Sequence, residues 1–273
     1  MTKLYLIEGL PCSGKSTTAR HIADRLSAAG KKTEFFDEGG GNHPADWEFH
    51  AYIADGILRK FSPELREKII NLDVRKQDGT PNENGSVVPL SEFSGGEIEQ
   101  LLPYKIYDSL PWETEMPLML GRWAEFTRKA CGGGSVYVFN CVFLQNPMCE
   151  TMMRFNFPKE RSFEYIARIH DSVKPLEPVL VYLKNDDIAE CVRKAAAERD
   201  GWLDAVIGYH LNGGYGKSIG ARGFEGYIAC LEERQRRELE FIGNSGMQRL
   251  VLENPHRDWA AAYGQIDALL ESA

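Results

Sequence analysis

Short apolar runs alternate with amphipathic stretches along most of the chain. Five apolar runs are typical of strands, and each lies next to a stretch with helical periodicity. They are 4–7, 135–144, 178–183 and 249–252, with a shorter run at 32–37. Continuous apolar runs are typical of strands buried on both faces of a parallel sheet. A spacing of three to four residues predicts helices at 16–29, 113–131, 163–173, 187–199, 225–241 and 257–271. The alternation predicts an α/β fold with three α/β/α layers around a five-stranded parallel sheet.

Two regions depart from this alternation. After a helix expected at 47–59, Ile69 to Val74 and Ser86 to Leu90 flank a polar turn that contains Asp78-Gly79 and Asn84-Gly85. This pattern predicts a hairpin-like insert at about 62–111. The glycine-rich section 208–226 is expected to be loop and to belong to a lid region at about 186–226. We therefore expect a single domain, 1–273, that carries one insert and one lid; a surface ornament is the alternative role for the insert.

The first apolar run leads into a glycine-containing loop. Gly9-Leu10-Pro11-Cys12-Ser13-Gly14-Lys15-Ser16 fits the pattern G-x-x-x-x-G-K-[ST], with a strand before it and a helix after it. Glycines let the backbone wrap closely around a phosphate, and the N-terminus of the following helix favours an anion. The motif predicts a P-loop NTPase.

The motif also assigns roles to its residues. Lys15 would reach the β- and γ-phosphates, and the Ser16 hydroxyl would ligate Mg²⁺. The expected ligand and cofactor are therefore ATP and Mg²⁺, although the motif does not exclude GTP. The residues expected to bind the nucleotide are Gly9, Pro11, Cys12, Ser13, Gly14, Lys15, Ser16 and Thr17.

An acidic pair follows the second predicted strand. Because ligands bind parallel sheets at the carboxyl ends of the strands, Asp37 and Glu38 are expected to face the γ-phosphate. A carboxylate at this place accepts the proton of an attacking hydroxyl or holds Mg²⁺ through water. We favour Glu38 as the base, and a solvated acidic turn is the alternative.

Basic residues of the predicted lid are candidates for charge stabilisation. Phosphoryl transfer develops charge on the equatorial oxygens, and arginines that close over the phosphates stabilise it. Arg199 and Arg193, with Lys194, lie on or after the helix that ends at 199. A solvated helix face is the alternative for them, and Lys217 and Arg222 form a competing lid.

Polar and aromatic side chains near the sheet edge are candidates for substrate contact. Gln145, with Asn146, follows the central strand and could hydrogen-bond a polar acceptor, while His43, Trp47 and Tyr52 could form its walls. Ordinary core packing is the alternative for the aromatic residues.

The composition and net charge limit the kinds of partner that this chain is expected to bind. The formal net charge of -8 and the lack of a basic stripe argue against nucleic acid as the main partner. The six cysteines show no C-x-x-C spacing, so neither a zinc site nor a disulfide framework is indicated. No apolar segment is long enough for a membrane helix, and we expect a cytoplasmic protein without a membrane partner. The expected partner is a small-molecule acceptor, with a second copy of the chain left open.

Together these residues resemble the P-loop kinases of the thymidylate kinase and deoxynucleoside kinase group. The resemblance rests on the phosphate loop, on Asp37-Glu38, on the strand 136–145 and on 187–199 as lid helix. In deoxynucleoside kinases the acidic residue is the general base and a Trp follows it at short distance, as Trp47 follows Glu38. Relatives carry an acid-Arg pair after the central strand, where this chain has Asn140-Cys141, so the chain is similar to a divergent member.

The sequence predicts a Mg²⁺-dependent kinase that transfers the γ-phosphoryl group of ATP to a nucleoside, a nucleotide or another small hydroxyl or phosphate acceptor. Two alternatives stay open. The Asn140 substitution favours a nucleotide-binding switch or a degenerate ATPase module without transfer. A polynucleotide 5′-kinase is disfavoured by the acidic net charge.

Overall fold

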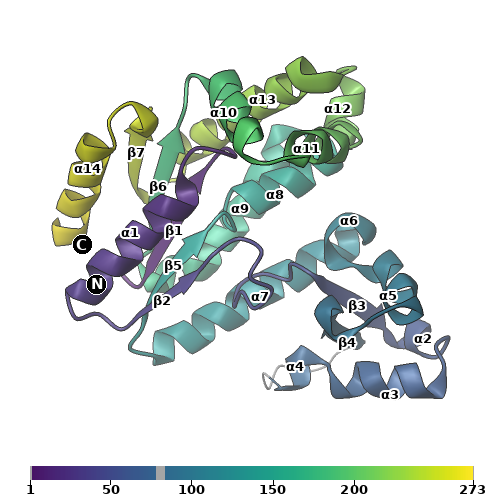
Figure 1. Cartoon of the computed structure of the whole chain (residues 1–273). Coiled ribbons are helices and arrows are strands. Elements are labelled where there is room, and N and C mark those ends of the chain that lie inside the picture. Colours follow the sequence, from purple (N-terminus) through teal and green to yellow (C-terminus); the bar gives the residue numbers. More distant parts are fainter. Residues whose placement is uncertain (1, 78–83, 273) are drawn as a thin grey trace. The chain divides into compact units, whose positions relative to one another are not determined.

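The computed structural model describes residues 2–77 and 84–272 (Figure 1). The chain divides into two compact units, which we call the core unit, 1–38 with 127–273, and the second unit, 39–126. The second unit begins earlier and ends later than the insert expected at about 62–111. Its predicted turn at Asp78-Gly79 lies outside the described residues.

The core unit contains the predicted five-stranded parallel sheet, with the strands in the order β2-β5-β1-β6-β7. Strand β1 lies in the middle, and its Ile7 pairs with Asn140 of β5 on one side and with Val181 of β6 on the other. The chain runs from β1 outward to β2, returns to β5 and then crosses to the other half. The switch therefore occurs at β1, where open parallel sheets bind ligands. The strands are β1 (Leu4–Gly9), β2 (Thr33–Phe36), β5 (Val136–Asn140), β6 (Val179–Lys184) and β7 (Gln248–Glu253).

Helices cover both faces of this sheet. On one face, α1 (Lys15–Ala28) and α14 (Trp259–Ser272) bury Ile22 and Ile266 against strand side chains such as Val181. On the other face, the Tyr182 hydroxyl of β6 donates a hydrogen bond of 2.6 Å to Glu238 of α13 (Gly223–Asn244). Because successive strand residues point to opposite faces, Val181 and Tyr182 are buried in different layers. The predicted α/β/α layering is thus present.

The remaining helices of the core unit follow the prediction closely except in the lid region. Helix α9 (Lys159–Val173) and α10 (Ile188–Glu198) lie where helices were expected. The section 208–226 was expected to be loop, and this was wrong, because it holds the end of α11 (Trp202–Leu211), all of α12 (Gly214–Ser218) and the start of α13.

The glycines of this section are needed for close packing. A Cβ on Gly213 would lie 2.3 Å from the Met153 carbonyl oxygen, and one on Gly216 would lie 2.8 Å from Leu211 Cα. Glycine allows one backbone to approach another, so a cluster of glycines marks tight helix contacts here and not a loop.

Strand β5 ends earlier than predicted. It was expected to run to Leu144, but Cys141 adopts a φ of 71°, which ends the extended backbone after Asn140. The buried Glu8 carboxylate of β1 then accepts hydrogen bonds from the backbone N–H groups of Phe143 and Gln145, at 2.7 and 3.0 Å. Burial and the nearby Glu238 carboxylate raise the pKa of Glu8 to about 7. Glu8 thus fixes the turn that carries Gln145.

The second unit is built around two antiparallel strands, β3 (His50–Ala54) and β4 (Gly85–Pro89). The helix expected at 47–59 was therefore wrong, since only the short α2 (Asp55–Leu58) is helical there. The hairpin expected between 69–74 and 86–90 was also wrong, because β4 pairs with β3 and half of the first segment belongs to α3 (Pro63–Asn71). The other helices are α4 (Val74–Gln77), α5 (Gly96–Leu101) and α6 (Ile106–Ser109), while α7 (Trp112–Gly132) contributes residues to both units.

Local sequence explains both corrections. Ala51 and Ile53 alternate as fully buried residues of β3, a period of two that was read as a helical period. Ser62 accepts a hydrogen bond of 3.2 Å from the Leu65 N–H, and Pro63 occupies the first turn of α3. A capping serine followed by proline is a helix start. In this segment the helix-start signal outweighs the preference of the β-branched residues in 69–74 for a strand.

A buried histidine makes the second unit sensitive to acid. Burial and the Arg122 charge lower the pKa of His43 to about 3, and its Nδ1 accepts a hydrogen bond from the Ala45 N–H. The unfolded chain takes up a proton near the ordinary pKa of about 6.5. Since the folded pKa is lowered, the stabilisation is complete above about pH 6.5 and is lost as the pH falls toward 3.

We expect the second unit to lose about 2 kcal/mol of unfolding free energy between pH 7 and pH 5 through this group. Urea unfolding at the two pH values measures the loss. The variant His43→Asn keeps an acceptor for the Ala45 N–H and removes the titration, so its loss should be smaller by that amount. An equal loss in both proteins would contradict the assignment.

The longest helices carry charges along much of their length. Helix α13 contains Glu233, Arg236 and Arg237, which form ion pairs at 2.7 Å on its surface. No helix in the described part of the chain combines the length and the apolar character that crossing a membrane requires.

Candidate functional site

The loop between β1 and α1 has the geometry of an anion cradle. Cys12 and Gly14 adopt positive φ values of 68° and 92°, which turn successive N–H groups inward. A Cβ on Gly9 would lie 2.7 Å from the Leu183 carbonyl oxygen, and one on Gly14 would lie 2.4 Å from the Trp259 ring. Both positions therefore require glycine. The loop leads directly into α1, whose N-terminus favours a phosphate.

Lys15 lies at the start of this helix. Its ammonium donates a hydrogen bond of 2.8 Å to the Leu10 carbonyl oxygen, and the side chain is buried. This bond holds the ammonium across the loop, where it can neutralise phosphate oxygens. Ser13 is also buried, and its hydroxyl has no hydrogen-bond partner among residues 2–77 and 84–272.

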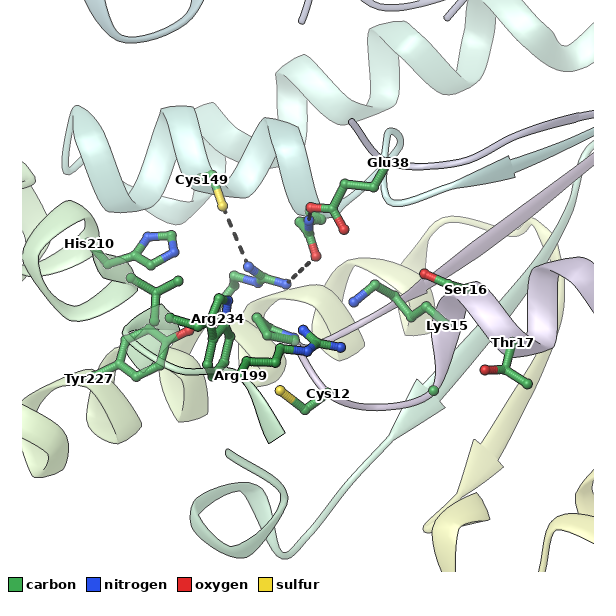
Figure 2. Close-up of a pocket in the computed structure, with 15 residues that line it drawn as sticks. Cys12, Lys15, Ser16, Thr17, Glu38, Cys149, Arg199, His210, Tyr227 and Arg234 are labelled. Carbon is green, nitrogen blue, oxygen red and sulfur yellow. Dashed lines mark hydrogen bonds between the residues drawn. The ribbon is translucent and has the colours of Figure 1, made fainter. Parts of the chain in front are cut away.

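A cavity of about 270 Å³ opens from the loop into the core unit. Figure 2 shows the Lys15 ammonium and the Arg199 guanidinium pointing into the same space, with Glu38 on the opposite side. His210 and Tyr227 lie at the end of the cavity away from Ser16 and Thr17. The other lining residues are Pro11, Cys12, Gly14, Gln145, Cys149, Trp202, Val206 and Arg234.

Asn140 connects the loop to the acidic pair. Its side-chain N–H groups donate to the Ser16 hydroxyl at 3.0 Å and to the Asp37 carboxylate at 2.7 Å. The Asp37 carboxylate is thereby brought close to the hydroxyl that is expected to ligate Mg²⁺. Asn140 is neutral, so the negative charge nearest to it in this contact is that of Asp37, which also lies 3.8 Å from the Arg20 guanidinium.

Glu38 is oriented by two donors. The Gln145 side-chain amide donates to one carboxylate oxygen at 2.6 Å, and the Cys141 thiol donates to the other at 3.3 Å. Burial raises the pKa of the Cys141 thiol well above its usual range, so the thiol stays protonated and able to donate. The carboxylate itself is exposed at the cavity. This arrangement suits a proton acceptor that must face a substrate.

The two arginines predicted to belong to a lid, Arg199 and Arg193, lie in different surroundings. Arg199 lines the cavity, with its guanidinium 5.7 Å from the centre of the Trp202 ring. The structure does not bring Arg193 to the cavity, because its exposed side chain stacks on Phe224 and lies 3.9 Å from Glu225, and its action at the site stays a prediction. Lys194 pairs with Glu190 on the surface of α10, and the cavity lining does not include Lys217 or Arg222.

The sequence analysis missed Arg234, a residue of α13. Its guanidinium is 1% exposed and donates to Glu238 at 2.8 Å and to the Gly9 carbonyl oxygen at 3.2 Å. Weaker contacts of 3.5 Å reach Gln145 and Cys149. The i, i+4 spacing of Arg234 and Glu238 was visible in the sequence, but such pairs are usually solvated. Only the fold shows that this pair is buried beside the phosphate loop.

The sequence analysis also missed the cavity wall that lies opposite the β1–α1 loop, for another reason. Trp202, Val206 and His210 form one stripe of α11, a helix for which the sequence predicted no element and whose last residues fell in the section expected to be loop. The His210 ring stacks on Tyr227 of α13, with ring centres 5.6 Å apart. Cys149, which also lines the cavity, begins the π-helical turn Cys149–Arg154. Burial raises the pKa of Cys149 to about 11.

Two predicted substrate residues belong to the second unit. Trp47 lines a separate cavity of about 600 Å³, where the Arg122 guanidinium lies 4.0 Å from the centre of its ring. His43 is buried in the same unit and accepts the Ala45 N–H, as described above. Their contact with an acceptor stays a prediction.

The metal ligands available to this site are few. Among the described residues, no three His, Cys, Asp or Glu side chains gather as a metal-binding group. Mg²⁺ keeps several waters and is usually bound by one or two protein ligands together with substrate phosphates. Ser16, with Asp37 behind Asn140, fits that mode of binding.

No protein-family model matches this chain, and no curated protein matches it. Functional inference therefore rests on the geometry of the site and on the phosphate-loop motif.

Proposed function

We propose that this chain is an ATP-dependent small-molecule kinase. It transfers the γ-phosphoryl group to a nucleoside, a nucleotide or another small hydroxyl or phosphate acceptor, as a divergent protein similar to the thymidylate kinase and deoxynucleoside kinase group. One observation carries the proposal: a loop with the phosphate-binding motif and an exposed, oriented carboxylate, Glu38, line the same cavity. A site for triphosphate binding alone needs no such carboxylate.

Different residues have different roles in the phosphoryl transfer. The loop N–H groups, Lys15 and Arg199 bind and neutralise the phosphates. An acceptor hydroxyl oxygen forms a bond to the γ-phosphorus, the bond to the oxygen bridging to the β-phosphate breaks, and ADP leaves with that oxygen. Glu38 takes the hydroxyl proton. Ser16, with Asp37 nearby, would hold Mg²⁺, which would supply neutralisation of the phosphate charge.

The competing interpretation is a nucleotide-binding switch or a degenerate ATPase module. It was favoured by Asn140, which stands where related kinases carry an acid. Asn140 donates a hydrogen bond to Asp37, and the negative charge beside Ser16 thus comes from another strand. This observation supports the kinase over the switch, because a charge near the metal is retained.

Asp37 is expected to set the affinity for Mg²⁺. The variant Asp37→Asn keeps the shape of the side chain and removes its charge, so the Mg²⁺ concentration for half-maximal activity should rise about tenfold. The measurement is ATP turnover against Mg²⁺ concentration at saturating ATP. Asp24→Asn, which removes an exposed carboxylate from α1, is the matched control and should leave the Mg²⁺ dependence unchanged.

Binding of ATP measured by calorimetry with and without Mg²⁺ tests the site itself. The proposal expects binding that strengthens with Mg²⁺ in the wild type, and weaker strengthening in Asp37→Asn. If ATP fails to bind under either condition, the kinase proposal is wrong. If the metal dependence of the variant equals that of the wild type, Asp37 has no part in holding Mg²⁺.

A further inference from the structure

The inner end of the core cavity presents hydrogen-bond donors. A guanidinium has five N–H groups, and those of Arg234 make four hydrogen bonds, two of them long contacts of 3.5 Å to Gln145 and Cys149. One N–H therefore has no partner among the described residues. The sulfur of Cys149 is in addition a weak acceptor. Arg234 thus keeps donor capacity toward the cavity.

Tyr227 adds a second donor. Its side chain is 0% exposed, and its hydroxyl has no hydrogen-bond partner within residues 2–77 and 84–272. Figure 2 shows the hydroxyl oxygen directed toward the middle of the cavity. A buried hydroxyl without a partner costs free energy, so such groups in folded proteins call for an explanation. A ligand in the cavity would supply the missing acceptor.

The Glu238 and Gln145 acceptors at this end are already occupied. The two Glu238 oxygens accept from Arg234 and from the Tyr182 hydroxyl, and the Gln145 carbonyl oxygen accepts from Arg234. Burial raises the pKa of Tyr227, which stays protonated and able to donate. A ligand group that fits here must accept hydrogen bonds from a fixed positive charge and a hydroxyl. Carboxylates and phosphates do this best.

The distance to the base limits the size of the ligand. The Gln145 side chain bridges the base, Glu38, and Arg234, since its amide contacts Glu38 at 2.6 Å and Arg234 at 3.5 Å. A molecule that reaches both Glu38 and Arg234 therefore spans one amide group and its two hydrogen bonds. The cavity of about 270 Å³ must also receive the phosphates at its loop end, so the space left beside Arg234 suits only a small molecule.

We propose that the acceptor is a small hydroxy acid, or a phosphorylated alcohol of similar size, whose acidic group binds Arg234 and Tyr227 while its hydroxyl faces Glu38. This inference rests on the kinase function proposed above. The hydroxyl oxygen bonds to the γ-phosphorus, its proton goes to Glu38, and ADP leaves with the bridging oxygen. Arg234 and Tyr227 hold the acid group and take no part in the proton transfer.

The first test separates acceptors by charge. A small-molecule cell extract freed of nucleotides is divided by anion exchange into an acidic pool and a neutral or cationic pool, and each is incubated with the full chain, Mg²⁺ and γ-labelled ATP. Labelled product from the acidic pool alone is the expected result. Pretreating that pool with phosphatase, removed before ATP is added, distinguishes a hydroxy acid, which still reacts, from a phosphorylated alcohol, which does not.

The outcomes separate the two proposals. Labelled product from the neutral or cationic pool overturns the acidic acceptor and leaves the kinase standing. If no pool yields a labelled product, the acidic acceptor is wrong, and if added nucleoside monophosphates yield none either, the kinase proposal falls with it.

The second test asks whether the Tyr227 hydroxyl holds the acceptor. Tyr227→Phe removes only this group, so we expect KM for the identified acceptor to rise about tenfold with KM for ATP and the melting temperature unchanged. Tyr5→Phe removes a buried hydroxyl of β1 outside the cavity lining and is the matched control, with all three quantities unchanged. An unchanged acceptor KM in Tyr227→Phe overturns the inference.

Discussion

Replacing Lys15 with alanine is expected to lower kcat/KM for transfer from ATP by about 10²- to 10³-fold. The ammonium lies in the cavity lining and is held across the loop by the Leu10 carbonyl oxygen. Charge that develops on the γ-phosphoryl oxygens would lose its nearest fixed cation in the variant. Steady-state kinetics with ATP as the varied substrate, together with calorimetric ATP binding, measure the loss.

The matched control is Lys32→Ala, which removes an exposed ammonium before β2. It should retain wild-type kinetics. Because the only hydrogen bond of the Lys15 ammonium in the described structure goes to the loop itself, the variant should keep its fold, as circular dichroism can check. Wild-type kcat/KM in a folded Lys15→Ala protein would contradict the assignment of the loop as a phosphate site.

Replacing Glu38 with glutamine is the second substitution with a large expected effect. Glutamine keeps the size of the side chain but cannot accept the hydroxyl proton, so kcat should fall by about 10²- to 10⁴-fold. ATP affinity should change little, because Glu38 lies on the side of the cavity opposite Lys15 and Arg199 (Figure 2). Single-turnover transfer and ATP binding, measured side by side, separate these two effects.

Glu34→Gln makes the same chemical change four residues earlier, on β2, and should leave transfer unaffected. A Glu38→Gln enzyme with undiminished turnover would remove Glu38 from the role of base. Loss of ATP binding in this variant would instead indicate that Glu38 acts on the nucleotide.

The sheet, and the glycine-containing turn from β1 to α1, could be predicted because their signals are local. Gly9, Gly14, Lys15 and Ser16 stand at fixed spacing, and continuous apolar runs mark strands that are buried on both faces. Asp37 and Glu38 could be placed because the carboxyl ends of parallel strands meet at one edge of the sheet. These inferences need no knowledge of which distant segments pack together.

The inner wall of the cavity could not be predicted because it depends on distant packing. Arg234 and Tyr227 lie on a long charged helix, and nothing in the sequence distinguishes the buried Arg234 from its exposed neighbour Arg236. The glycines near 213–216 are typical of loops, yet they allow helix contacts that only the fold shows. The burial of one arginine among several is decided by tertiary structure.

The second unit shows a limit of periodicity. Residues 50–54 form a strand because they pair with 85–89, and that pairing leaves no local trace beyond five residues of alternation. Short apolar segments of this kind fit a helix or a strand equally well. Ser62-Pro63 marked the start of α3 correctly, but β-branched residues in the helix gave the opposite indication.

Transfer of label from γ-labelled ATP to a small molecule tests the central claim most directly. The full chain, Mg²⁺ and a small-molecule extract freed of ATP but supplemented with nucleoside monophosphates are incubated together, the products are identified by mass spectrometry, and Lys15→Ala is treated in parallel. The account predicts a labelled phosphate ester or phosphoanhydride that forms with the wild type and is absent with the variant. Tight ATP binding without any transferred label in the wild type would contradict the kinase and favour a nucleotide-binding switch.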